Sequence, residues 1–189
     1  MITIDEIRAL AKRDDSKPRY NGLGMIRLHL RDVGYNFYSE RTEPFNHTIH
    51  DHRYSFTSSV LKGVLRNRLY DYQEVDYETD YRLTYKTMFG KIDYDTHGVV
   101  IHENVELRET CTFETRAGQQ YHLDRSAFHS AEAVTDKVIT CMTRPSDLPW
   151  EAMSTFIVNK RKPYEGVYSR PKTENECWEI IEYTINADK

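Results

Sequence analysis

The sequence predicts an all-β fold, a sandwich or a barrel, with a short helix near each end. Closely spaced runs rich in Val, Ile, Thr, Tyr and Phe fill the middle of the chain, and turn-forming residues such as Gly63 and Gly118 separate them. Short strands at this spacing are typical of a sandwich or a barrel. Because 189 residues suffice for one sizeable core, we expect a single domain over residues 1–189.

The first expected element is an amphipathic helix over residues 4–13. Apolar residues recur there at helical spacing, and Thr3 with Glu6 forms a capping box at its start. The expected strands follow, over residues 25–30, 35–38, 47–61, 64–72, 77–88, 99–101, 105–115, 119–123, 128–134 and 137–143. The predicted barrel therefore covers about residues 25–145.

A C-terminal extension over residues 146–189 completes the expected order of elements. Prolines and weak periodicity mark its first part, and a terminal helix is predicted over residues 174–183. Its apolar side contains Cys177, Ile180 and Ile181, which we expect to pack on the outside of the sheet.

Charge and cysteine content narrow the classes of function. The net charge is −4 and no stretch concentrates Lys or Arg, so nucleic acid is not an expected partner. No apolar run approaches the length of roughly 20 residues that spans a bilayer, so a membrane is not expected either. Three widely spaced cysteines and a start without a leader pattern predict a reduced, intracellular protein, located in the cytoplasm.

A His-x-His pair, His50 and His52, is the most informative motif. Residues two apart on a strand point to the same face, so the two imidazoles would converge. Imidazole suits zinc, iron, copper and nickel, but two ligands rarely hold a metal alone, and His129 is the best third candidate. The opposing interpretation, ordinary surface or core histidines, is less favoured because a β-type run closing on Gly63 and a second strand follow directly.

These residues resemble the cupin superfamily, small double-stranded β-helix barrels with two short motifs. His50, His52 and Gly63 match the first motif, and Gly118 with the Phe128-His129 pair matches the second, over roughly residues 25–145. The spacing from His52 to Gly63 is similar to small, largely uncharacterised cupins with the signature His-x-His-Pro-Trp-Asp-Phe-x-Ser-x-x-Leu-x-Gly. Arg53, Tyr54 and Ser55 replace Pro, Trp and Asp here.

A weaker resemblance is to the thiol dioxygenases. The segments 49–52 (Ile-His-Asp-His) and 69–72 (Leu-Tyr-Asp-Tyr) echo their motifs, although the spacing from His52 to Gly63 is one residue short. Those enzymes carry an Arg that binds the substrate carboxylate upstream of the His pair. The resemblance makes Arg27, and less directly Arg19, candidates for that role.

The expected metal shell consists of three neutral histidines. Phe56 and Thr57 stand where the resemblance places a carboxylate ligand. Such a shell leaves the charge of a divalent metal uncompensated, which favours an anionic or bidentate substrate on the metal. The resemblance makes Fe(II) the preferred cofactor, with zinc or another divalent metal as the alternative. A protein carboxylate bound to the metal would contradict this expectation. The carboxylates to examine first are those of Glu103, Glu106 and Asp124.

Strand parity predicts which other side chains lie on the same face as the His pair. Tyr54 and Ser58 share the parity of the His pair and are candidate substrate contacts, whereas Phe56 is expected to fill the barrel. His47 would face the other way on a continuous strand, and His122 is a candidate partner for a ligand histidine.

The function favoured by these observations is a metal-dependent cupin enzyme, an Fe(II) oxygenase acting on a small polar or anionic molecule. Two alternatives stay open: a cupin that binds a sugar or nucleotide without turnover, and a cupin-type sugar isomerase or epimerase. The expected partner is a small-molecule substrate or ligand, and a homodimer is a further candidate assembly.

Overall fold

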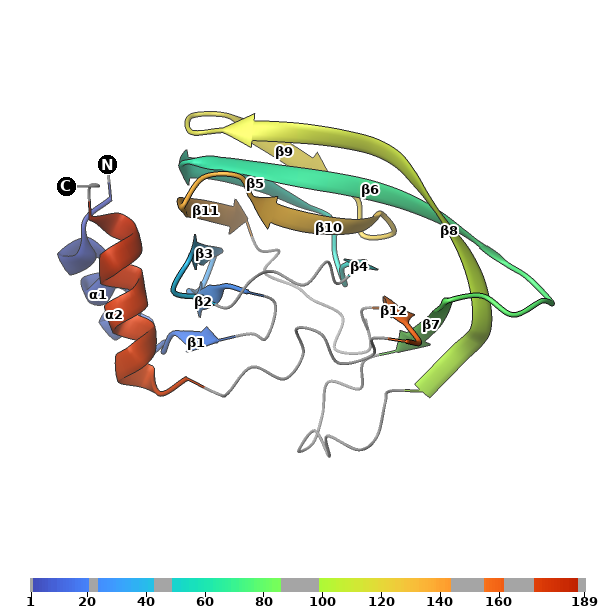
Figure 1. Ribbon diagram of the computed structural model, residues 1–189. Coiled ribbons are helices and arrows are strands. Elements are labelled where there is room, and N and C mark those ends of the chain that lie inside the picture. Colours follow the sequence, from blue (N-terminus) through green and yellow to red (C-terminus); the bar gives the residue numbers. More distant parts are fainter. Residues whose placement is uncertain are drawn as a thin grey trace.

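Two antiparallel sheets and two helices form the protein in the computed structural model, which describes residues 2–20, 24–42, 49–85, 99–143, 155–161 and 172–186 (Figure 1). Both helices lie at one end of the molecule, and the longest strands run away from them. The elements, in chain order, are α1 (Ile4–Arg13), β1 (Arg19–Tyr20), β2 (Ile26–His29), β3 (Val33–Ser39), β4 (Ile49–His50), β5 (Phe56–Lys62), β6 (Val64–Glu74), β7 (Tyr81–Tyr85), β8 (Val99–Arg116), β9 (Gln120–Leu123), β10 (Phe128–Ala133), β11 (Lys137–Thr143), β12 (Thr155–Asn159) and α2 (Glu174–Ile185).

The strands divide into an open sheet and a closed one. Sheet A has the order β1-β2-β3-β11-β5-β9, so a strand from late in the chain lies between β3 and β5. Sheet B closes on itself in the order β10-β4-β12-β7-β8-β6, because β6 pairs with both β8 and β10. The predicted fold class, an all-β barrel with short helices near both ends, is confirmed.

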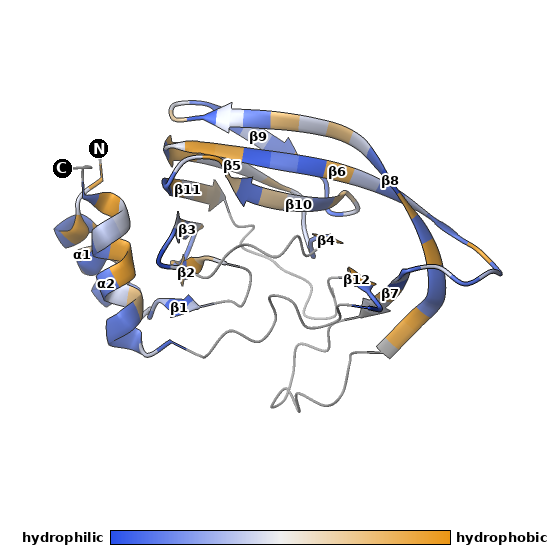
Figure 2. Ribbon diagram, in the orientation of Figure 1, coloured by the Kyte–Doolittle hydropathy of each residue, from blue (hydrophilic) through white to orange (hydrophobic). Residues whose placement is uncertain are grey.

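The helices cover one face of sheet A. Both begin at a capping box, at Thr3 for α1 and at Thr173 for α2. Hydrophobic residues alternate with hydrophilic ones along each helix (Figure 2), and the hydrophobic ones pack on β2, β3 and β11. The predicted packing of Cys177, Ile180 and Ile181 on the sheet is confirmed.

A second core fills the space between sheets A and B. Val60 of β5 and Val138 of β11 contact Leu65 of β6 and Ala131 of β10 there. A third core lies on the opposite face of sheet B, inside the ring, and is built around Ile49, Leu83, Val105, Phe128 and Ile157. Alternate residues of β10 therefore face different cores, with Phe128 inside the ring and Ala131 between the sheets.

Three predicted strand boundaries were wrong. The single strand expected over residues 47–61 is two strands in different sheets, β4 in sheet B and β5 in sheet A; residues 47 and 48 lie outside the described residues. The strands expected over 99–101 and 105–115 are one continuous strand, because β7 pairs with the first part of β8 and β6 with the rest. The strand expected from residue 77 begins at Tyr81.

Two strands were missed: the two-residue β1, which pairs with β2, and β12. β12 lies in the extension that we expected to be irregular before its helix, and it joins β4 to β7 to complete the ring. In the described part of the chain no helix is both long enough and apolar enough to cross a membrane.

Candidate metal centre

Three histidines meet between the two sheets. His50 ends β4, His129 lies in β10 directly opposite it in the strand register, and His52 follows two residues after β4. One ligand atom from each imidazole lies within 4.8 Å of the other two. His50 and His129 are 8% and 4% exposed, and His52 is partly exposed. The predicted trio is therefore assembled, and it forms a group that could hold a metal ion.

A bend, rather than strand parity, brings His52 to the cluster. After His50 the chain leaves sheet B, and the Asp51 N–H donates to the Thr155 carbonyl at 3.1 Å. The Asp51 carboxylate accepts from the N–H and the hydroxyl of Thr155 at 2.6 and 2.7 Å. The His52 N–H then donates to the Arg125 carbonyl at 3.1 Å. The expectation of one continuous strand was wrong here, yet its conclusion that His50 and His52 converge holds.

Asn67 orients His129. Asn67 lies fully buried on β6, and its Oδ1 is 3.1 Å from Nδ1 of His129. An amide oxygen can only accept, so it selects the tautomer with hydrogen on Nδ1 and leaves the Nε2 lone pair free for a metal. Nε2 of His129 lies 2.7 Å from Nε2 of His52. Two ligands about 2.1 Å from one metal would be about 3.0 Å apart at a right angle, so a small adjustment suffices.

Burial favours the neutral form of two histidines of the cluster, His52 and His129. It lowers the pKa of His129 well below the ordinary value of 6.5, and the nearby charges of His50 and Arg27 act in the same direction. Burial is also the largest cause of the lowered pKa of His52, followed by the two neighbouring imidazoles and Arg27. Neutral imidazole is the form that ligates metals, so the site needs no deprotonation at neutral pH.

Aromatic rings surround the imidazoles. The ring of Phe56 meets that of His52 edge-on at 4.6 Å between centroids, and Phe156 of β12 stacks on His50 at 5.7 Å. Phe56 therefore stands at the wall of the site, where the cupin pattern would place a carboxylate. Apolar walls lower the local dielectric and limit solvent access around a metal site.

Among the described residues, no carboxylate belongs to the cluster. The group of potential metal ligands consists of the three histidines alone. Glu103 and Glu106 on β8 are exposed, and exposed Asp124 lies 3.5 Å from Nε2 of His122. His122 itself is exposed and lies against Thr57, so its expected partnership with a ligand histidine was wrong.

The predicted substrate contacts lie in different surroundings. Ser58 is 1% exposed and faces the space between the sheets. Tyr54 is partly exposed and packs on Phe56 with centroids 6.4 Å apart. Arg27 is part-buried on β2 and acts electrostatically on His52 and His129, whereas Arg19 is exposed on β1. Ser58 and Arg27 are thus the predicted contacts nearest to the interior.

Sequence reasoning missed Asn67 and Phe156. A signal for Asn67 existed, because Leu65 and Leu69 share its strand parity, and a polar residue between two inward leucines needs a partner. Phe156 belongs to the unpredicted β12, so its contact with His50 could not be foreseen.

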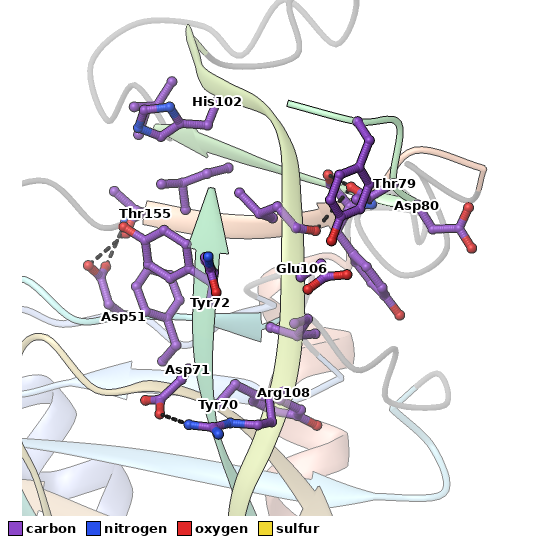
Figure 3. A pocket seen from close by; sticks show the side chains of 18 of the residues that line it. Asp51, Tyr70, Asp71, Tyr72, Thr79, Asp80, His102, Glu106, Arg108 and Thr155 are labelled. Atoms are coloured by element: carbon purple, nitrogen blue, oxygen red, sulfur yellow. Dashed lines mark hydrogen bonds and ion pairs between the residues drawn. The ribbon is translucent and has the colours of Figure 1, made fainter. Parts of the chain in front are cut away.

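A cavity of about 1470 Å³ lies on the other face of sheet B, inside the ring (Figure 3). Its wall combines tyrosines such as Tyr70 and Tyr72 with acidic groups including Asp71, whose carboxylate pairs with Arg108 at 3.1 Å. Asp51 also lines it. Consecutive residues of the His-x-His motif therefore face two compartments, with the imidazoles on one side and the Asp51 carboxylate on the other.

Comparisons with known proteins add little to this geometry. No protein-family model and no curated protein matches the sequence. Structural matches include Drosophila melanogaster CENP-C bound to CAL1, with TM-score 0.37 and 14% identity over 66% of this chain and 72% of that one. A recombinant oxalate oxidase in complex with glycolate matches with TM-score 0.32 and 14% identity, over 72% of this chain and 46% of that one. The ligand-free L-ribose isomerase of Cellulomonas parahominis matches with TM-score 0.33 and 12% identity, over 81% and 64% of the two chains.

All three of these structural matches have TM-scores below 0.5 and identities below 25%. At such low scores they carry no argument about a ligand or an activity. What the chain itself provides is a closed antiparallel barrel with a buried group of three histidines that could hold a metal ion.

Proposed function

We propose that this protein is a metal-dependent enzyme of the cupin class that binds one divalent metal through His50, His52 and His129. The observation that carries the proposal is the convergence of three imidazoles, all within 4.8 Å, from a strand, a bend and a second strand. The lowered pKa values of His52 and His129 and the Asn67 acceptor behind His129 prepare nitrogen lone pairs at one point.

The donor set suits Fe(II) first, with zinc or another divalent ion as the alternative. Three neutral nitrogen ligands leave coordination positions open, and a bound Fe(II) would supply oxygenase chemistry there, whereas zinc would supply a Lewis acid. The protein's own part is to hold the imidazoles, to keep them unprotonated and to screen the site with Phe56 and Phe156.

The ligand class in this proposal is a small polar or anionic molecule. Three neutral imidazoles add no negative charge, and Arg27 contributes a cation that has no carboxylate partner among the described residues. A bound divalent ion would raise the positive charge further, so an anionic ligand would gain the most on entering. Ser58 and Arg27 are the proposed contacts, and Tyr54 a proposed contact nearer the solvent.

The metal assignment is tested by element analysis of purified protein and of two single variants. We expect about one divalent metal per chain in the wild type and in His122→Ala, whose histidine is exposed and outside the cluster. His129→Ala should lose most of it, because it removes one of three ligands. Stoichiometric metal in His129→Ala would overturn the assignment.

The activity assignment is tested with Fe(II)-loaded protein under controlled oxygen. Pools of small thiols and organic acids are added without oxygen, and the iron spectrum is recorded before oxygen is admitted. A spectral change followed by oxygen consumption supports an oxygenase. If a bound cellular ligand is released chemically unchanged and oxygen is never consumed, the oxygenase assignment fails and the non-catalytic ligand-binding role replaces it.

A further inference from the structure

The cavity inside the ring of sheet B has an apolar floor. Leu83 of β7, Val105 of β8 and Phe128 of β10 line the cavity and belong to the buried core of the ring. These three side chains form the floor. The cavity volume of about 1470 Å³ exceeds the roughly 300–1,000 Å³ of common small-molecule sites. The cavity therefore has room for an extended ligand, and its floor can contact a hydrocarbon chain.

Tyrosines form part of the cavity wall. Tyr72 of β6 packs edge-on against Phe128 with the ring centroids 5.2 Å apart, yet it is 37% exposed. Tyr77 also lines the cavity and is 52% exposed. Only two other large apolar or aromatic side chains of the described residues, Leu61 and Val134, are as strongly exposed. Exposed aromatic surface gathered in one cavity is typical of a binding site, and the negative face of a tyrosine ring attracts cations.

Carboxylates outnumber guanidinium groups among the described residues of the cavity wall. The acidic residues are Asp51, Asp71, Glu78, Asp80 and Glu106, and the one arginine is Arg108. Arg108 pairs with Asp71 at 3.1 Å, and the Asp51 carboxylate is bound to Thr155. Glu78 and Glu106 have no ion-pair partner in the part of the chain that the structure describes. The wall is thus an anionic surface that attracts a cation and repels an anion.

The carboxylates are spread around the cavity rather than gathered at one point. In Figure 3, Asp51 lies at the left of the cavity, Asp80 at the right and Asp71 below them. A hydrogen bond to Glu106 raises the pKa of Tyr77, so a carboxylate and an aromatic ring meet at the wall. No three of these carboxylates come close enough together to hold a metal ion. A bare divalent cation needs several oxygen ligands at one point, whereas a chain with separated ammonium groups does not.

We propose that this cavity binds a linear diamine or polyamine, with the methylene chain on the floor and the ammonium groups against the carboxylates and tyrosines of the wall. Alkylammonium groups are protonated at neutral pH, as in lysine. Burial of the chain stabilises the complex, and Tyr72, Glu78 and Glu106 stabilise the charged ends. The inference goes beyond the proposed metal centre and does not depend on it, because the imidazoles lie on the other side of sheet B.

Calorimetric titration with three probes of equal chain length tests the ligand class. The probes are 1,8-diaminooctane, 1,8-octanediol and suberate, which differ only in the charge of their ends, and spermine is added as a polyamine. We expect diaminooctane and spermine to bind at least about tenfold more tightly than the diol, and suberate to bind more weakly still, because the wall is anionic. Magnesium chloride, a divalent cation without a chain, should also bind at least about tenfold more weakly than diaminooctane.

Variants of the wall locate the site. The double variant Glu78→Gln with Glu106→Gln removes two carboxylates and should weaken diaminooctane binding by at least about fourfold. Tyr72→Leu should weaken it by about two- to fivefold, whereas Tyr72→Phe keeps the ring and should keep the wild-type affinity. Glu103→Gln is the matched control, because Glu103 is an exposed glutamate on the same strand as Glu106 and does not line the cavity. A thermal melt of each variant confirms that it folds.

Binding in the cavity and binding at the histidine cluster give different results. Amines can ligate metals, so the diaminooctane titration is repeated after a chelator has removed any metal, and the same Kd is expected. A loss of binding on metal removal would place the amine at the histidines and overturn the inference, while the proposed metal centre still stood. Equal affinity for the diol or for suberate would overturn the ligand class. Unchanged affinity in both the double glutamate variant and Tyr72→Leu, or no binding of diaminooctane at about 10 mM, would overturn the site.

Discussion

At the scale of single residues, burial sets the protonation of the candidate centre. His52 and His129 face each other with their Nε2 atoms 2.7 Å apart, and both have pKa values well below 6.5. Two charged imidazoles at that separation would repel each other in a low-dielectric interior. The folded, metal-free protein therefore holds both rings neutral where the unfolded chain would begin to protonate them.

This difference predicts an acid-sensitive fold for the metal-free protein. Below pH 6.5 the unfolded chain takes up protons on these imidazoles and the folded chain does not, so the free energy of unfolding falls as the pH falls toward the folded-state pKa values. From about pH 7.5 to about pH 5.5 we expect the melting temperature to drop by at least about 2 °C.

Thermal melts in matched buffers check this, with a double variant, His52→Gln with His129→Gln, as the comparison. The variant should lose clearly less stability over the same interval, because its side chains do not titrate there. His122→Ala should behave like the wild type, since His122 is exposed. Equal slopes in the wild type and the double variant would contradict the argument.

Residue types and spacing were enough to predict which histidines meet. His50, His52 and His129 were identified from a short motif and one distant residue, and the structure brings them together. The contact of Asn67 with His129 could not be predicted from the sequence alone, because it depends on β6 lying beside β10 in a particular register. The proposed roles of Tyr54, Ser58 and Arg27 remain predictions, as does the single-domain division.

At the scale of elements, one glycine governs the passage from sheet A to sheet B. Gly63 connects β5 to β6 with φ +74°, a conformation that side chains disfavour. A Cβ built there would overlap the carbonyl oxygen of Lys137 and the hydroxyl of Thr135. Gly118 has a similar φ of +88° but open space around its hypothetical Cβ.

The pair predicts two different losses of stability. Gly118→Ala should lower the free energy of unfolding by about 1–2 kcal/mol, the penalty of the left-handed backbone alone. Gly63→Ala should lose at least about 2 kcal/mol more, because backbone must also move. Urea denaturation of both variants measures the difference, and equal losses would show that the close approach at Gly63 is unimportant.

Helix α2 is anchored by a lysine from the sheet. Nζ of Lys62 on β5 donates to the carbonyls of Thr184 and Asn186 at 2.9 and 2.8 Å, at the C-terminal end where helix carbonyls lack partners. Lys62→Met should lower the free energy of unfolding by about 2 kcal/mol. That loss corresponds to a fall of about 4–8 °C in melting temperature.

Lys17→Met is the control for this prediction. Lys17 also reaches α2, through an ion pair with Glu174 at 2.9 Å, but both side chains are largely in solvent. Its replacement should change stability by less than about 0.5 kcal/mol. Similar melting temperatures for the two variants would mean that Lys62 acts as an ordinary surface charge.

Elements with strong local signals were the predictable ones. Both helices carry a capping box that can be read in the sequence, at Thr3 and at Thr173, and both begin where it places them. β12 has no such local signal in the sequence, because its five residues form a strand only by pairing with β4 and β7. The break after His50 likewise depends on hydrogen bonds to Thr155, more than a hundred residues away.

At the scale of the whole molecule, the candidate centre links parts of sheet B to the bend that leads into sheet A. A metal bound only by the folded state stabilises it by about 2.7 kcal/mol at a concentration one hundred times the Kd. We therefore expect zinc to raise the melting temperature by about 5–10 °C. A chelator should reverse the rise, and His129→Ala should not show it, whereas an equal rise in that variant would place the bound zinc elsewhere.

The strand order also determines when the candidate metal centre can form during folding. β10 and β12 hold β4 from both sides, and β11 enters sheet A between β3 and β5, so the walls around His50 come from the last third of the chain. Pairings between such distant segments form slowly, because long loops must close first. A newly made chain could therefore bind a metal at the proposed centre only after β10 and β12 have been synthesised and paired with β4. If the proposed centre binds metal, the metal-bound fraction of a preparation would equal the fraction of chains in which sheet B is fully paired. The rate of metal uptake during refolding would then report the rate at which sheet B closes.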